Sequence, residues 1–223
     1  MAEQRASKLT ADAIVATAID VADADGLSAL SMRRIADDLG VGAMSLYRHV
    51  ADKDALLEAM AEEIGRRFPY PVHDDGPWTW RQRVAIAVDI DWDLYRQHPW
   101  VVLAYSAPRY SFGLDALEGL DWLAAGFLDL GVDIVRATEM ALSLWNYVNG
   151  VVLATVSEQF LGTERPGDRP SGLADLIDGR TAPHLPHLAG LASASGAARL
   201  TDPRALLDAG VAALCAGFEA TAG

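Results

Sequence analysis

Apolar residues recur every three or four positions along nearly the whole chain, and this spacing is the feature that most restricts the fold. Ile14, Ala18 and Val21, for example, form one stripe near the start of the chain. Such a stripe covers one face of an α-helix and buries it against a neighbour. No long stretch alternates apolar and polar residues as a half-buried strand does. The sequence therefore predicts an all-α protein.

Capping residues and glycines divide the first part of the chain into four helices. Thr10, Ser31 and Asp52 stand where helices begin, because their side-chain oxygens can accept a hydrogen bond from an amide of the first turn. Gly26 and Gly40 stand where helices end, because glycine adopts the left-handed conformation without a Cβ penalty. The expected order is a helix over residues 10–25, a short helix between Ser31 and Gly40, a third over 43–50, and a fourth after Asp52.

The segment PYPVHDDGPW, residues 69–78, interrupts this pattern with prolines and a glycine. We place a domain boundary there, which gives domains 1–68 and 69–223. All of the tryptophans lie at or beyond Trp78. Between 162 and 196 the chain is rich in Gly, Pro, Ala and Ser, so we expect a long loop with one short helix near 173–177. The helices expected beyond residue 78 cover about 79–97, 112–130, 133–160 and 202–220.

Composition points to the cytoplasm and gives no support to nucleic acid as a partner. The net charge is −13, so a DNA-binding surface would have to be local. The longest apolar run, residues 141–156, is interrupted by Asn146 and Asn149 and is too short for a membrane span. The N-terminus lacks the layout of an export signal, and the single Cys215 suits a reducing compartment. We therefore expect a cytoplasmic protein without a membrane partner.

The second and third helices, with Gly40 and Gly42 in the turn between them, have the layout of a helix-turn-helix. Leu46 and Val50 would anchor the third helix. A helix held in this way can enter a major groove with its first residues at base edges. The alternative is a core tyrosine followed by a solvated polar face. The residues expected to face outward are Ala43, Met44, Ser45, Tyr47, Arg48 and His49.

The stretch LSALSMRRIADDLGVGAMSLYRHVADKDALLEAM, residues 27–60, resembles the DNA-binding domain of the Tet repressor (TetR) family. The matching elements are the Leu-Gly-Val turn, the Leu-Tyr-x-His-Val core and the lysine before Ala-Leu-Leu. A second, weaker resemblance covers about residues 78–159, where DLYRQHPW and SLWNYVNGVVLATV are similar to the regulatory domain of the tetracycline-repressor type. The resemblance implies a three-helix DNA-binding domain joined to a larger helical bundle for ligand binding and dimerisation.

The resemblance also implies roles for individual residues in DNA binding. Tyr47, His49 and Lys53 would touch phosphates, and Arg33 would lie at the groove edge with Arg34 beside it. The leading residues of the third helix would meet base edges, with Arg48 reaching a base or a phosphate. The predicted DNA-binding set is Arg33, Arg34, Ala43, Met44, Ser45, Tyr47, Arg48, His49 and Lys53.

A reading helix this short contacts few base pairs, so specificity requires two copies on a palindromic operator. The predicted dimer seam uses the last two long helices, through Ala141, Gly150, Ala154, Leu206, Leu207, Gly210, Val211 and Leu214. The resemblance implies a small-molecule effector, and the aromatic residues of the middle helices suggest that it is apolar or aromatic. Its predicted site is Trp92, Tyr95, Trp100, Tyr105, Tyr110, Trp122, Trp145, Asn146 and Asn149. The alternative for both sets is ordinary core packing within one chain.

The remaining polar residues give no competing site. Asp89, Asp91 and Asp93 are best explained as a surface ion-pairing group, although an inward Asp would favour a cationic ligand. We predict no metal and no cofactor, and the absence of a phosphate loop or nucleophile elbow argues against an enzyme. The prediction is a ligand-responsive transcriptional regulator, by default a repressor. The alternatives are a constitutive DNA-binding helical protein without a ligand and, less favoured, a helical enzyme.

Overall fold

The computed structural model describes residues 9–73, 76–107, 113–160, 184–185, 187–191 and 194–222. Helices and turns make up these residues, and no strand occurs among them, which confirms the all-α prediction. The chain forms two compact units, Met1–Ala141 and Leu142–Gly223. The domain boundary proposed at residue 69 lies inside the first unit and stays a prediction.

The first helices begin and end where local chemistry places them. Helix α1 (Ala11–Asp25) is capped by Thr10, whose Oγ1 accepts from the Ala13 amide at 3.1 Å. It stops at Gly26, whose φ of 78° suits glycine. The short 3-10 helix η1 (Leu27–Ala29) leads to α2 (Met32–Asp38). Ser31 caps α2 by accepting from the Arg34 amide at 3.2 Å.

Helix α3 (Ala43–Leu46) is shorter than the expected 43–50. Residues 47–49 form turns, and the His49 amide donates to the Leu46 carbonyl at 2.8 Å, the tighter pattern of a helix that is ending. The reason lies in the next helix, α4 (Lys53–Arg67). Asp52 is extended, so that its Oδ1 accepts from the Ala55 amide at 2.8 Å, and the chain leaves the helical conformation before α4 begins.

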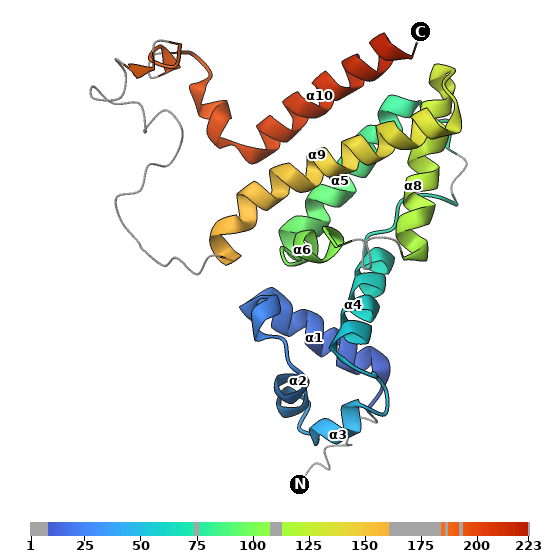
Figure 1. The fold of residues 1–223 in the computed structure, drawn as a ribbon, viewed down its shortest axis with the longest axis vertical. Coiled ribbons are helices and arrows are strands. Elements are labelled where there is room, and N and C mark those ends of the chain that lie inside the picture. The colour runs from blue at the N-terminus through green and yellow to red at the C-terminus, as the bar shows by residue number, and fades with distance from the viewer. Residues whose placement is uncertain are drawn as a thin grey trace. The chain divides into compact units, whose positions relative to one another are not determined.

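These four helices share one apolar core. Ile14 and Ile19 of α1, Ile35 of α2, Leu46 of α3 and Leu56 of α4 have no exposed surface. Helix α1 packs against α4 and α2, and α2 packs against α3 (Figure 1). Leu46 thereby fixes α3 on the core, and the rest of that helix is left on the outside.

The first unit continues with α5 (Trp80–Gln97), α6 (Val101–Tyr105), α8 (Leu114–Phe127), the 3-10 helix η2 (Leu128–Leu130) and the start of α9 (Ile134–Phe160). A capping box of Thr79 and Gln82 begins α5. The helices expected near 79–97 and 112–130 are confirmed, whereas α6 was not expected. Helix α5 packs on α8, and α4 packs on both α6 and α8. Trp100 and Phe127 are among the largest fully buried side chains.

The second unit holds the rest of α9, the 3-10 helix η6 (Ala197–Thr201) and α10 (Pro203–Thr221), which Asp202 caps. The Tyr147 hydroxyl donates to the Leu206 carbonyl at 3.0 Å. A Cβ at Gly210 would overlap that hydroxyl, so α10 can approach Tyr147 only because residue 210 is glycine. The short helix expected near 173–177 lies outside the described residues.

Helix α9 combines length with an apolar composition. Over Ile134–Ser157 it is long and apolar enough to cross a membrane by length and composition alone. One such helix is weak evidence, because the core helix of a water-soluble protein passes the same test. Val148 and Val152 of α9 are buried, in line with a core helix.

Candidate functional site

The outward face of α3 and the turn after it carries an exposed row of side chains. Met44 is 79% exposed and Tyr47 is 46% exposed, and both Arg48 and His49 are exposed. The same segment is held on the core by Leu46, fully buried, and by Val50 at 6% exposure. Ala43 and Ser45 are half-buried at the start of the row. Tyr47 is thus not a core residue, and the outward orientation predicted from the sequence is observed.

The cationic residues that flank this row differ in the contacts they make within the chain. Arg33 is exposed, whereas the Arg34 guanidinium pairs with Asp38 at 3.0 Å and with Asp25 at 3.3 Å. The hydrogen bond and charge of Asp38, then the charge of Asp25, raise the pKa of Arg34. Arg34 therefore ties α2 to α1 and is less available for DNA than Arg33. Lys53 Nζ donates to the Leu30 carbonyl at 2.9 Å, which leaves two of its three donors for another acceptor.

The predicted ligand residues fall into two groups, one in each unit. In the first unit Tyr95, Trp100 and Trp122 are buried, while Trp92 and Tyr105 are half-buried. In the second unit Asn149 is buried, Trp145 is half-buried and Asn146 is exposed. Tyr110 lies outside the described residues. Burial alone therefore does not gather the set into one site.

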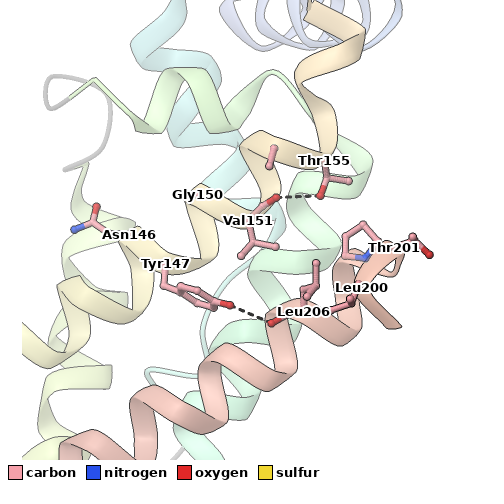
Figure 2. A pocket seen from close by; sticks show the side chains of 10 residues that line it. Asn146, Tyr147, Gly150, Val151, Thr155, Leu200, Thr201 and Leu206 are labelled. Carbon is pink, nitrogen blue, oxygen red and sulfur yellow. Dashed lines mark hydrogen bonds between the residues drawn. The ribbon is translucent and has the colours of Figure 1, made fainter. Parts of the chain in front are cut away.

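A cleft of about 640 Å³ lies between α9 and α10 in the second unit. Figure 2 shows Tyr147 reaching from α9 to Leu206 near the start of α10 at this cleft. Asn146, predicted for the ligand, lines it together with Gly150, Ala154 and Leu206, predicted for the dimer seam. These seam residues are exposed, which a contact with a second chain requires.

The other predicted seam residues are less available. Gly210, Val211 and Leu214 are half-buried in the single chain. Ala141 and Leu207 have no exposed surface at all, so they pack within their own chain as the alternative interpretation expected. The predicted seam residues most accessible to a second chain are therefore Gly150, Ala154 and Leu206.

A second cleft, of about 650 Å³, lies in the first unit between the segment before α5, α5 itself and α8. Trp122 and Arg83 line it, with Glu118 and Asp121 near them. The Arg83 guanidinium lies 4.8 Å from the Trp122 ring centroid, and its Nη1 donates to the Trp122 carbonyl at 2.9 Å. Of the predicted ligand residues, Trp122 therefore lies at a cleft of mixed polarity.

Asp91 is the residue that sequence analysis misjudged. It is 9% exposed, and its Oδ1 accepts from the Tyr70 hydroxyl at 3.0 Å. Burial raises the pKa of Asp91 from 3.8 to about 7, and the hydrogen bond from Tyr70 lowers it in part. Burial, followed by the charge of Asp91, also raises the pKa of Tyr105. The assignment of Asp91 to a surface ion-pairing group was wrong, although the buried spacing Val84, Val88, Asp91, Tyr95 would have placed it inward.

Comparison with known proteins gives a consistent result. The model of the family of bacterial regulatory proteins called tetR matches residues 14–60. The HTH-type transcriptional repressor DrrR1 of Streptomyces coeruleorubidus is 33% identical over 167 residues, which cover 75% of this chain but only 59% of that repressor. An HTH-type transcriptional regulator of Saccharopolyspora erythraea is 33% identical over 96% of this chain and 86% of its own length.

A solved structure of similar fold is ActR of Streptomyces coelicolor in complex with actinorhodin. It is 27% identical, with a TM-score of 0.75 over 97% of this chain and 100% of that chain. The match in sequence along nearly the whole chain and the match in fold point to the same group of proteins. The chain belongs to the tetR family of bacterial regulatory proteins, which are transcriptional regulators and not enzymes.

Proposed function

We propose that the protein is a ligand-responsive repressor that binds a palindromic DNA operator as a homodimer and leaves it when a small-molecule effector binds. The observation that carries this proposal is the exposed row from Met44 to His49 on a segment anchored by Leu46 and Val50. Family membership supports the same conclusion. Because the operator is DNA, the protein acts in the cytoplasm.

On DNA, the first residues of α3 face base edges and its end faces the backbone. Met44 is long, apolar and exposed, which suits contact with a thymine methyl group. Tyr47 and His49 supply donors to phosphates, as Lys53 does with its remaining N–H groups. Arg48 reaches a base or a phosphate from the same exposed row.

A homodimer follows from the size of the reading helix. Helix α3 has four residues, which cannot contact enough base pairs for a specific site. Two copies on half-sites about one helical turn apart solve this problem. Gly150, Ala154 and Leu206 support a seam at the α9–α10 cleft, because two small residues let a second chain approach closely.

An effector is supported by the family and by the aromatic residues of the first unit. ActR has been solved in complex with actinorhodin, so a protein of this fold holds a small molecule. Half-buried Trp92 and Tyr105, and Trp122 at its cleft, favour an apolar or aromatic compound here. The effector would stabilise a conformer whose two reading helices no longer match the spacing of the grooves.

The test begins with selection of duplexes from a random DNA library by the full-length protein. Anisotropy titrations with the selected duplex should then show weaker binding for Tyr47→Ala and Met44→Ala. Val135→Ala, at another exposed apolar side chain outside the helix-turn-helix, serves as the control and should bind as the wild type does. Equal affinity for all of these proteins would contradict the assigned surface, and failure to enrich any duplex would contradict the function itself.

The constitutive alternative differs only in lacking an effector. A panel of apolar and aromatic compounds, including actinorhodin, would be screened by thermal shift and then by release of the selected duplex. A compound that stabilises the protein and releases DNA supports the ligand-responsive repressor. Stabilisation by none of them would favour the constitutive protein.

A further inference from the structure

The last turn of α1 is joined to the break between α5 and α6 by one carboxylate. His98 Nδ1 lies 2.9 Å from each carboxylate oxygen of Asp23, and Trp100 Nε1 donates to Asp23 Oδ1 at 2.8 Å. Both donors stand in the three-residue junction after α5. Asp23 therefore links α1, which packs against α2 of the helix-turn-helix, to the helices that follow residue 78.

Both rings that contact Asp23 are buried. Trp100 is 1% exposed and His98 is 8% exposed, so neither ring can exchange its partner for water. An indole N–H is only a donor, and leaving it unpaired inside the protein is costly. Asp23 satisfies both donors with a side chain that is only 27% exposed. The His98 ring also meets Phe68, the residue that ends α4, edge-on at 5.7 Å.

From Asp23 the connection continues toward DNA. Helix α1 packs directly against α2 and α4, and α2 packs against α3. Asp25, also in the last turn of α1, pairs with Arg34 of α2 at 3.3 Å. That ion pair is exposed and adds little stability by itself. A movement of α1 would therefore reach α2 mainly through the packing of the two helices. A shift of the α5–α6 junction would therefore move α1 and, with it, the orientation of α3.

The α5–α6 junction is also flanked by residues suited to contact an effector. Helix α5 carries Asp91 and half-buried Trp92, and α6 ends at half-buried Tyr105. The Tyr105 hydroxyl donates to the Ala61 carbonyl of α4 at 3.3 Å. A compound that displaced α5 or α6 would thus act on His98 and Trp100, which lie between them.

We propose that Asp23, acting through His98 and Trp100, is a positioning residue for operator binding that transmits the position of the α5–α6 junction to α1 and the reading helix. This inference rests on the proposed function. It names a coupling residue that touches neither DNA nor effector. Both sites bias the same contact, so DNA binding must also affect the junction.

The first experiment measures amide hydrogen exchange of the full-length protein without DNA. We expect Asp23→Asn and Trp100→Phe each to speed exchange both in residues 22–26 and in residues 98–104, by about tenfold, the scale of one lost hydrogen bond to a charged group. Asp20→Asn, an exposed carboxylate on the same helix, is the control and should leave both segments unchanged. Faster exchange in only one segment would overturn the link between them.

The second experiment adds the duplex selected by the wild-type protein. DNA should slow exchange in 98–104 of the wild type, although these residues do not touch DNA. In Asp23→Asn this remote protection should be lost while residues 43–50 stay protected, which a merely stabilising residue would not produce. Persistence of the remote protection in the variant, or its absence in a wild type whose residues 43–50 are protected, would overturn the proposal. Protection of no segment by DNA would instead refute the proposed function, and the first experiment would still decide whether Asp23 joins the two segments.

Discussion

Replacing Asp91 by Asn should make the protein more stable above neutral pH. In the folded protein the pKa of Asp91 is raised from 3.8 to about 7 because the carboxylate is buried. Between these two values the folded state holds a proton that the unfolded state releases, so stability falls as pH rises. At 1.36 kcal/mol for each step of one in pKa, the full effect is roughly 4 kcal/mol. Asn cannot ionise and keeps an oxygen that can accept from the Tyr70 hydroxyl.

The assay is the free energy of unfolding from denaturant titrations between about pH 4 and pH 8. We expect the two proteins to be similar at the acidic end and Asp91→Asn to gain progressively toward pH 7. Asp93→Asn, an exposed carboxylate two residues along the same helix, is the control and should follow the wild type at every pH. If the Asp91→Asn profile runs parallel to that of the wild type, or lies below it at pH 8, the carboxylate is not destabilised by burial and the reasoning is wrong.

Three further substitutions test other parts of the fold and site. Gly210→Ala should destabilise the second unit by about 1–3 kcal/mol in thermal unfolding, because the new Cβ displaces Tyr147; Gly217→Ala, whose Cβ meets no atom within 4 Å, should be neutral or stabilising. Arg48→Ala should weaken binding to the selected duplex, and a phosphate role predicts a fall of about one in the salt slope while a base role leaves that slope unchanged. Asp52→Ala should lower stability by about 1 kcal/mol in denaturant titrations, since α4 loses its cap; no change would mean that the Ala55 amide finds another acceptor.

The helices could be predicted because their signals are local. Thr10, Ser31 and Asp52 cap helices by bonding amides three residues away, and the sequence alone places those partners. The length of α3 was mispredicted because it depends on competition between two elements. The apolar spacing of Leu46 and Val50 permits a longer helix, but Asp52 must be extended to begin α4.

The exposed row on α3 could be predicted for the same local reason, whereas the aromatic site could not. Tyr47 faces outward because Leu46 and Val50 take the inner face of one short segment. Trp100 and Trp122 are the same residue type, yet one is buried against α1 by its bond to Asp23 and the other lines a cleft. Only the packing of helices distant in sequence separates these outcomes. Asp91 was misjudged because the rarity of buried Asp was weighted above its position in an apolar stripe.

The acidic balance of the chain is compatible with DNA binding because three carboxylates near the helix-turn-helix have structural partners. Asp23 holds the α5–α6 junction, Asp38 pairs with Arg34, and Asp52 caps α4. Meanwhile Arg48, on the outer row of α3, is exposed. The charge of the outer row of α3 is thus set by which side chains the fold engages, and not by the net charge. It follows that Asp38→Asn, which removes one of the two carboxylates that pair with Arg34, should change DNA affinity less than Arg48→Ala does, although each substitution alters the net charge by one.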